Sequence, residues 1–288
     1  MANDDATRER WRREVEREFA SPRAVAGWRT WQEEWAACTR PLTDRLLEAA
    51  QLAPGQRVLD VGSGTGEPAL TIASLFGPGG SVVATDPSPD LLAVAEERAA
   101  RAGLANLTCR RADVAALPFP DESFDRVTCH LAVMYFLDPV AGLAEMRRIL
   151  RPGGRAAVLV WGDPGHASYA AAFFGPILSR TTLPDPEPGA PQPYRFAAPG
   201  TLRQALEAAG FQEVDEQVQL VSVRFPGTAA DYMRWFREVA IPMDFIWERL
   251  GPEETERAIE ETVANMRQFE HGGAVQMEVE VVVGTGVR

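Results

Sequence analysis

A short apolar segment that runs directly into three closely spaced glycines constrains the fold of this chain most. Residues 57–61 read Arg-Val-Leu-Asp-Val, Gly62, Gly64 and Gly66 follow, and a helical pattern covers 68–76. Glycines permit a tight turn from strand to helix and let the backbone approach a ligand closely. In an open α/β sheet such a turn lies at the carboxyl ends of the strands, where ligands bind. The pattern therefore predicts a nucleotide-type binding site in an α/β domain.

Strands and helices alternate along the residues after the glycine loop. Apolar runs predict further strands at 81–85, 107–110, 124–131 and 155–161. Helical patterns separate these strands at 91–102 and 139–150. This alternation is typical of βαβ units, which form a parallel sheet with right-handed crossovers. Alternating segments at 214–225 and 277–283 predict a C-terminal strand pair.

We predict six segments from these patterns. The N-terminal segment is expected to be helical because Trp28, Trp31 and Trp35 recur at helical spacing, and Leu42 and Leu46 continue on another helix. The proline-rich stretch 184–193 predicts an extended surface loop. The six segments are an N-terminal helical cap (1–56), a core with the glycine loop (57–162), an insertion or substrate loop (163–200), a continuation of the core (201–225), a helical substrate-cap insertion (226–273) and a final core strand (274–288).

Composition argues against several classes of partner. The chain has 29 Lys and Arg against 41 Asp and Glu, a net charge of −12, and so acidic a surface repels phosphate backbones. We therefore expect no nucleic-acid partner. No run approaches the ~18 apolar residues of a membrane span, so no span is expected. Three scattered cysteines and a charged N-terminal segment favour a reducing, cytoplasmic location. No His, Cys or carboxylate cluster has metal-ligand spacing, so no metal is expected.

Acidic side chains accompany the glycine loop at three successive strand ends. Asp60 precedes the first glycine, Asp86 ends the second strand, and Asp113 follows the third. The glycine spacing is GxGxG rather than the GxGxxG of a dinucleotide site, and a carboxylate at the position of Asp60 repels a pyrophosphate but attracts an ammonium group. A carboxylate at Asp86 can accept both hydroxyls of a ribose. These residues favour a nucleoside that bears an amino acid over a dinucleotide.

The sequence resembles a known family, the class I methyltransferases that use S-adenosylmethionine (SAM). The resemblance runs over about residues 40–165, and the segment LPFPDESFD (117–125) is characteristic of the subgroup that includes the ubiquinone/menaquinone-biosynthesis methyltransferases. Four motifs carry it in order: VLDVGSGTG (58–66), VVATDPSPDLL (82–92), CRRADVAALPFPDESFDRVTCHLAVMYF (109–136) and EMRRILRPGGRAAVLVWG (145–162).

The resemblance implies a Rossmann-like α/β fold: a mostly parallel sheet with a C-terminal antiparallel strand, N-terminal helices and a helical substrate cap. It also implies SAM as cofactor and S-adenosylhomocysteine as product. Asp60 and the loop would cradle the methionine moiety, Asp86 the ribose and Asp113 the adenine, with the backbone of His130 and Leu131 near the reactive sulfur. The cofactor residues implied are Asp60, Gly62, Ser63, Gly64, Thr65, Gly66, Asp86, Pro87, Asp113, Val114, His130 and Leu131.

Histidine and aromatic residues supply the candidates for catalysis and substrate binding. His130 ends the fourth strand and is the best candidate general base, with a buried structural histidine as the alternative. Trp28 and Trp31 could contact substrate or, alternatively, pack in the core of the helices. Tyr194 and Arg195 could orient a substrate or, alternatively, lie on the surface. The candidate substrate residues are Trp28, Trp31, His166, Tyr194 and Arg195.

The reaction expected is in-line displacement at the methyl group of a sulfonium. Its main demand is that sulfur, methyl and nucleophile lie in line with water excluded. The acceptor predicted is a small molecule with an O-, C- or N-nucleophile, because the Asn/Asp-Pro-Pro-Tyr/Phe motif of nucleic-acid methyltransferases is replaced here by Cys129-His130-Leu131-Ala132. Two alternatives stay open: a SAM-binding protein without methyl transfer, and an NAD-dependent oxidoreductase. We expect a monomer or a homodimer.

Overall fold

The computed structural model describes residues 5–182, 187–240 and 244–288, and these fall into two compact units. Each unit is described by itself. Unit 1 comprises residues 1–41, 163–190 and 220–280, and unit 2 comprises residues 42–162, 191–219 and 281–288. Three long elements run from one unit into the other along the chain: the helix α2 (Pro22–Ala50) and the strands β6 (Gln212–Pro226) and β8 (Ala274–Val287).

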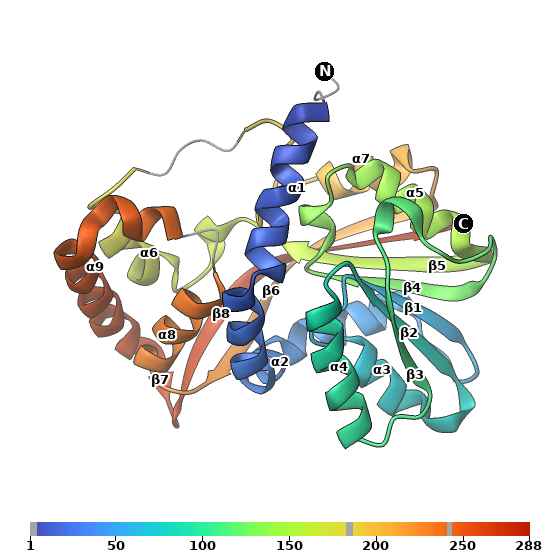
Figure 1. The fold of residues 1–288 in the computed structure, drawn as a ribbon, viewed down its shortest axis with the longest axis horizontal. Coiled ribbons are helices and arrows are strands. Elements are labelled where there is room, and N and C mark those ends of the chain that lie inside the picture. Colours follow the sequence, from blue (N-terminus) through green and yellow to red (C-terminus); the bar gives the residue numbers. More distant parts are fainter. Residues whose placement is uncertain (1–4, 183–186, 241–243) are drawn as a thin grey trace. The chain divides into compact units, whose positions relative to one another are not determined.

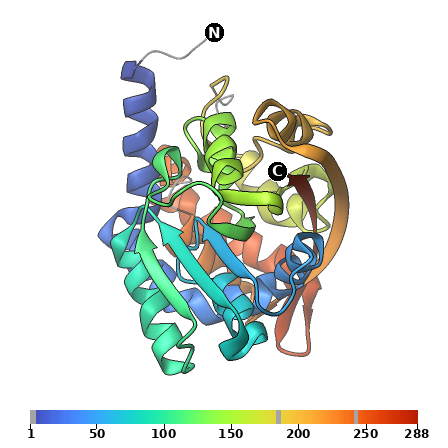
Figure 2. The ribbon, with the colours of Figure 1, turned by 90° about the vertical axis from the view of Figure 1, so that its right-hand side faces the viewer.

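Unit 2 is built on a sheet whose first five strands are parallel. The sheet order is β3-β2-β1-β4-β5-β8-β6, with β8 antiparallel to β5. Figures 1 and 2 show the parallel strands side by side. The direction of winding reverses between β1 and β4, the place at which open α/β sheets bind ligands. The other elements of this unit are β1 (Arg57–Val61), α3 (Ala69–Phe76), η1 (Gly77–Gly79), β2 (Ser81–Asp86), α4 (Pro89–Arg101), β3 (Leu107–Arg111), η2 (Val114–Ala116), β4 (Phe124–His130), η3 (Val133–Tyr135), α5 (Pro139–Ile149), β5 (Leu150–Trp161) and α7 (Thr201–Ala208).

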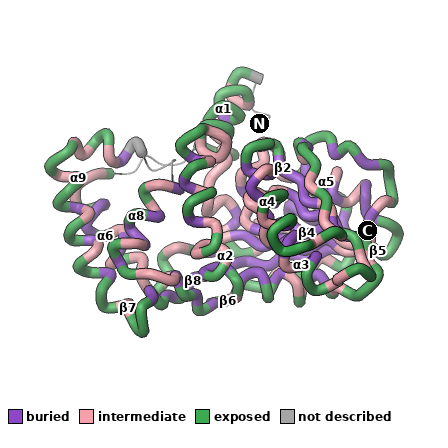
Figure 3. The backbone as a smooth tube through the Cα atoms, turned by 60° about the horizontal axis from the view of Figure 1, so that its bottom comes forward, coloured by how far each residue is buried: buried purple, intermediate pink, exposed green. Residues whose placement is uncertain are grey.

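Apolar side chains cover both faces of this sheet. On one face, Leu143 and Met146 of α5 and Leu202 and Leu206 of α7 are fully buried in the main core cluster. On the other face, α3 packs onto β1 and β2 through a second cluster. Figure 3 shows the central strands mostly in the colour of buried residues, with exposed residues on the outer sides of the helices. Burial on both faces explains why these strands have nearly continuous apolar sequences.

Unit 1 is mainly helical and rich in aromatic contacts. Phe173 lies at its centre, with ring centroids 4.7 Å from Phe236 and 5.4 Å from Tyr232. Arg180, which follows the helix α6, forms ion pairs with Glu254 and Glu261, both on the helix α9. Its remaining elements are α1 (Asp5–Ala20), η4 (Pro164–His166), α6 (Ala170–Leu178), α8 (Ala229–Val239), α9 (Asp244–Met266), η6 (Arg267–Phe269) and β7 (Glu270–His271).

The structure confirms the predicted fold class, a mostly parallel sheet with a C-terminal antiparallel strand, and corrects several elements. The two helices predicted around the tryptophans and Leu42 are one 29-residue helix, α2, which continues through Pro41. The helix α6 was not predicted, because Gly175 and Pro176 break its pattern. Strand β5 begins at Leu150, earlier than predicted, because that residue pairs with Phe124 across a register shift.

Residues 184–186 of the predicted proline loop lie outside the described residues. The division into six segments remains a prediction. Among the described helices, none is both long and apolar enough to cross a membrane.

Candidate functional site

The glycine loop is fastened to the ends of β1 and β2 by backbone hydrogen bonds. The amides of Gly62 and Ser63 both donate to the carbonyl of Thr85, at 2.8 and 2.9 Å. Gly62 has a φ of 72°, and a Cβ on it would lie 2.4 Å from the Cβ of Ala132. Glycine is therefore required at this position both by the backbone conformation and by the close approach of the chain after β4.

Two hydroxyl groups beneath the loop fix it further. The Ser63 hydroxyl donates to the carbonyl of Asp60 at 3.1 Å and accepts from the Thr85 amide at 3.2 Å. The Thr85 hydroxyl donates to the same Asp60 carbonyl at 2.9 Å. These bonds hold the backbone of the loop in one conformation against the end of β1, so a ligand meets a preformed surface.

Asp86 is buried at the carboxyl end of β2 and accepts two backbone hydrogen bonds. The Gly64 amide donates to Oδ2 at 3.0 Å and the Ser88 amide to Oδ1 at 2.9 Å. Burial raises the pKa of Asp86 to about 6, although the Ser88 and Gly64 amides act in the opposite direction. Asp86 thus links the glycine loop to the start of α4, and each of its oxygens retains lone pairs for a further donor.

Asp60 is fully buried at the position where β1 pairs with β4. Its Oδ1 accepts a 2.7 Å hydrogen bond from the hydroxyl of Thr128, its register partner on β4. Its Oδ2 is buried and has no hydrogen-bond partner among the described residues. Burial raises the pKa of Asp60 to about 7. An ionised carboxylate with one unsatisfied oxygen in such a place is unstable unless a cationic or hydrogen-bonding ligand completes it.

His130 is the last residue of β4, the strand that pairs with the Asp60 strand β1, and Leu131 follows it. His130 is buried, its Nε2 has no partner within the described part of the chain, and burial lowers its pKa to about 4. The imidazole is therefore neutral near pH 7. Leu131 has a φ of 55°, although it is not glycine. Such backbone strain persists only where the surroundings impose it, and it concentrates at functional sites.

Asp113 and Val114, predicted to bind the adenine, follow β3. Asp113 is exposed and caps η2, with its Oδ1 accepting a 2.9 Å hydrogen bond from the Ala115 amide. Asp113 is therefore the N-cap of η2, a role that aspartates often have. The cap uses only Oδ1 and does not use Oδ2. Val114 is half-buried against the core cluster. Pro87, predicted to lie beside the adenine, is exposed, and its carbonyl accepts from the Arg111 guanidinium at 3.0 Å.

Arg195 and Gln192 are hydrogen-bonded to the segment after β4. The Arg195 guanidinium donates to the carbonyl of Phe136 at 2.6 Å, and the Gln192 amide donates to the carbonyl of Met134 at 3.2 Å. Burial lowers the pKa of Arg195. Within unit 2, the structure thus brings the substrate candidate Arg195, the residue after Tyr194, to the segment that follows the predicted cofactor residues His130 and Leu131.

The other substrate candidates belong to unit 1. Trp31 is 4% exposed, and its indole N–H donates to Glu238 at 2.6 Å, so it has a structural role in the helical core. Trp28 is half-buried against Trp35, with ring centroids 6.0 Å apart. His166 is exposed, and its Nδ1 lies 2.6 Å from Glu280, whose hydrogen bond raises the histidine's pKa.

Arg98 is a residue of the site that the sequence analysis missed. Its guanidinium donates to the carbonyl of Thr65 in the glycine loop at 2.7 Å and to Glu67 at 3.1 Å. Glu67 in turn accepts from the Thr71 hydroxyl at 2.7 Å. No sequence signal distinguishes Arg98 from its neighbours on α4, because the interaction crosses from that helix to the loop.

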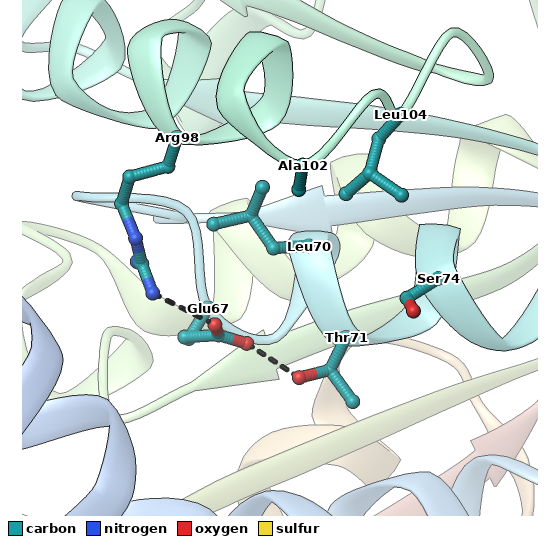
Figure 4. A pocket seen from close by; sticks show the side chains of 7 residues that line it. All are labelled: Glu67, Leu70, Thr71, Ser74, Arg98, Ala102 and Leu104. Atoms are coloured by element: carbon teal, nitrogen blue, oxygen red, sulfur yellow. Dashed lines mark hydrogen bonds and ion pairs between the residues drawn. The ribbon is translucent and has the colours of Figure 1, made fainter.

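Arg98 also lines an open cavity of about 230 Å³ between α3 and α4 (Figure 4). Leu70 and Leu104 form part of its apolar lining. The lining includes none of the predicted cofactor residues, so we do not assign it to the cofactor. In the described part of the chain, no group of three or more His, Cys, Asp and Glu side chains is arranged to hold a metal ion.

A doubly wound sheet, a glycine loop at its switch point and acids at neighbouring strand ends define an α/β protein that binds a nucleoside-type ligand. Comparisons with known proteins agree. A family model described as "Methyltransferase domain" matches residues 59–158. The chain is 31% identical over 258 residues to nocamycin O-methyltransferase of Saccharothrix syringae, covering 86% of this chain and 90% of that protein.

Two further relatives extend this result. Over 183 residues the chain is 33% identical to the ubiquinone/menaquinone biosynthesis C-methyltransferase of Ectopseudomonas mendocina, which covers 58% of this chain and 70% of that protein. The solved structure of the YcgJ protein of Bacillus subtilis shares the fold, with a TM-score of 0.54, 19% identity and coverage of 85% and 97%. The chain belongs to the SAM-dependent methyltransferase family, and its cofactor is SAM.

Proposed function

We propose that this protein transfers the methyl group of SAM to a small-molecule acceptor by in-line displacement. The observation that carries the proposal is the buried Asp60 carboxylate, whose Oδ2 has no partner among the described residues, beside a glycine loop that is held in place. The ammonium group of a methionine moiety is a donor that would complete this oxygen. A pyrophosphate would not, because it carries negative charge.

The residues divide into three groups by the part of the cofactor that they would hold. Asp60 and the loop 62–66 would hold the methionine moiety, and Asp86 would accept hydrogen bonds from the ribose. Asp113, with Pro87 and Val114, would bind the adenine. For Asp113 this role must use the oxygen that does not cap η2.

SAM supplies an activated methyl group, so the work of the protein is to orient and to exclude water. The strained backbone at Leu131 and the close contact between Gly62 and Ala132 bring the end of β4 against the glycine loop. His130 is a weak base, because burial holds its pKa near 4. We therefore propose that neutral His130 positions a ligand through a hydrogen bond at Nε2 and does not act as the general base.

We propose an oxygen nucleophile as the methyl acceptor. Nocamycin O-methyltransferase matches over most of both chains, whereas the similarity to the C-methyltransferase of Ectopseudomonas mendocina covers 58% of this chain. With an acidic phenol or enol acceptor, the hydroxyl proton can pass to water, so no strong protein base would be needed.

Calorimetric titration with SAM and, separately, with NADH tests the cofactor assignment. We expect saturable SAM binding and no response to NADH. Asp86→Ala should weaken SAM binding by about tenfold or more, since it removes hydrogen bonds to a charged group. Asp90→Ala is the matched control, because Asp90 lies on the exposed first turn of α4, four residues further on.

Labelled SAM and a panel of phenols, enols and amines then test methyl transfer. Transfer to oxygen acceptors alone supports the proposal. Transfer to carbon or nitrogen alone contradicts the oxygen assignment. SAM binding with no transfer to any acceptor would favour a SAM-binding protein without methyltransferase activity.

A further inference from the structure

Asp60 has one polar and one apolar side chain as its neighbours in the sheet. The strand β1 lies between β2 and β4, and the register pairs Asp60 with Ala84 on β2 and with Thr128 on β4. The alanine has no polar side-chain atom, whereas the Thr128 hydroxyl donates to Asp60 Oδ1 at 2.7 Å. Of the two residues that flank Asp60 in the sheet, only Thr128 therefore binds the carboxylate.

The Thr128 hydroxyl is held in a fixed place. Thr128 is fully buried on β4, a strand that is paired with β1 on one side and with β5 on the other. Because it is branched at Cβ, a threonine has few accessible rotamers. The 2.7 Å distance is typical of a hydroxyl that donates to a carboxylate. This bond uses Oδ1 and leaves Oδ2, which is also buried, without a partner among the described residues.

The same bond decides which oxygen of Asp60 carries the proton when the carboxyl group is neutral. While Thr128 donates to Oδ1, the proton lies on Oδ2. An ammonium group needs a lone pair of Oδ2, so the proton and the ammonium group compete for one atom. Burial raises the pKa of Asp60 to about 7, and the Glu67 and Asp86 carboxylates act in the same direction. The Ser63 and Thr128 hydroxyls lower this pKa and so favour the ionised form that a cation can bind.

Two more titratable groups, Cys129 and His130, follow Thr128 on β4. Burial raises the pKa of the Cys129 thiol and lowers the pKa of His130 to about 4. Both groups are therefore neutral near pH 7. A substitution at Thr128 leaves these two groups and both neighbouring carboxylates in place, so a comparison with the wild-type protein isolates the effect of the hydroxyl.

We propose that Thr128 is a positioning residue for cofactor binding: its hydroxyl holds Oδ1 of Asp60, so that Oδ2 is presented in ionised form to the ammonium group of the methionine moiety. The inference rests on the proposed function, because it adds a residue to the SAM site of that reaction. Thr128 acts through Asp60. Without the hydroxyl, Oδ1 loses its donor, and the neutral carboxyl group persists to higher pH and competes with SAM.

Calorimetric titration with S-adenosylhomocysteine at several pH values tests the inference on the intact protein. This probe carries the same amino-acid group as SAM and has no methyl group to transfer. Thr128→Val replaces the hydroxyl by a methyl group of similar size. We expect this variant to hold the Asp60 proton about tenfold more tightly, the effect of one hydrogen bond to a charged group. The Kd ratio of variant to wild type, in which the titration of the probe cancels, should be about fivefold larger at about pH 6 than at about pH 8.

Thr85→Val is the matched control. The Thr85 hydroxyl is also buried, but it donates to the Asp60 carbonyl at 2.9 Å and not to the carboxylate. Its loss should therefore change the Kd by the same factor at every pH. Thr128→Ser keeps a hydroxyl at this position and should restore most of the wild-type affinity. Thr128→Ala removes the hydroxyl with a smaller side chain and should show the same pH dependence as Thr128→Val.

Three results would overturn the inference. One is a Kd ratio for Thr128→Val or Thr128→Ala that does not change with pH, since the hydroxyl would then have the same structural role as that of Thr85. The second is wild-type affinity in these variants at every pH, and the third is a folded Thr128→Ser protein that binds as weakly as Thr128→Val. With normal binding by the wild-type protein, each of these results contradicts only this inference. Wild-type protein that binds neither SAM nor S-adenosylhomocysteine contradicts the proposed function.

Discussion

Replacing Asp60 with asparagine should stabilise the ligand-free protein while it weakens SAM binding. Burial raises the pKa of Asp60 from 3.8 to about 7, a difference of about 3 units or about 4 kcal/mol between the two protonation states. An asparagine has no charge to bury, and its oxygen can keep the hydrogen bond from Thr128. Its amide nitrogen would be a buried donor without a partner, which costs about 1–3 kcal/mol. The expected net gain near pH 8 is about 1–3 kcal/mol.

The sign of the pH dependence follows from the raised pKa. In the folded wild-type protein Asp60 keeps its proton up to about pH 7, whereas in the unfolded chain it loses it near 3.8. The favourable contribution of Asp60 to the free energy of unfolding is therefore largest below about pH 3.8, and it is lost as the pH rises through the folded pKa of about 7. The variant lacks this term. The difference in unfolding free energy between variant and wild type should widen up to about pH 7 and stay constant above it.

Urea unfolding of both proteins without SAM, followed across this pH range, measures the difference. Asp125→Asn is the control of opposite sign. Partial burial alone would raise the pKa of Asp125, but the Arg57 amide and the Arg151 guanidinium lower it overall. That variant should lose stability at neutral pH. A difference between Asp60→Asn and wild type that does not change with pH, or a wild-type protein that is the more stable at pH 8, would refute the argument.

Three further predictions concern the glycine loop. Gly62→Ala should abolish measurable SAM binding in calorimetry, because its Cβ would lie 2.4 Å from that of Ala132 and its φ is 72°; undiminished binding would contradict this geometry. Arg98→Met should raise the Kd for SAM by about tenfold through loss of the bonds to Thr65 and Glu67, and Arg98→Lys should recover part of that affinity. SAM affinity should fall as the pH drops through the pKa of Asp60, about 7, and then that of Asp86, about 6, and a pH-independent Kd would contradict the binding of SAM by these two carboxylates.

The core of the fold could be predicted because each of its strands has a recognisable pattern in a short stretch of sequence. The strands β1, β2 and β4 are short, largely buried runs; Gly62 follows β1 directly, and β2 ends at Asp86. The helix α2 was divided wrongly because Pro41 resembles a helix end. Pro41 removes one hydrogen-bond donor, and side chains buried before and after it, those of Cys38 and Leu42, hold the helix together. That packing is a tertiary effect without a local signal.

The chemistry of the candidate site also depends on tertiary packing, which the sequence does not reveal. The sequence identifies Asp60 and His130 by their places after predicted strands, but their protonation depends on burial. Burial raises the pKa of Asp60 to about 7 and lowers the pKa of His130 to about 4. Near neutral pH, Asp60 is therefore less ionised than an exposed aspartate, and His130 is less protonated than an exposed histidine. We therefore propose that His130 donates or accepts a hydrogen bond as a neutral ring rather than acting as the general base. Conversely, the aspartate is protonated about half the time near pH 7 in the absence of ligand. A cationic group bound at its Oδ2 would shift it to the ionised form, so SAM binding near neutral pH should be accompanied by release of a proton.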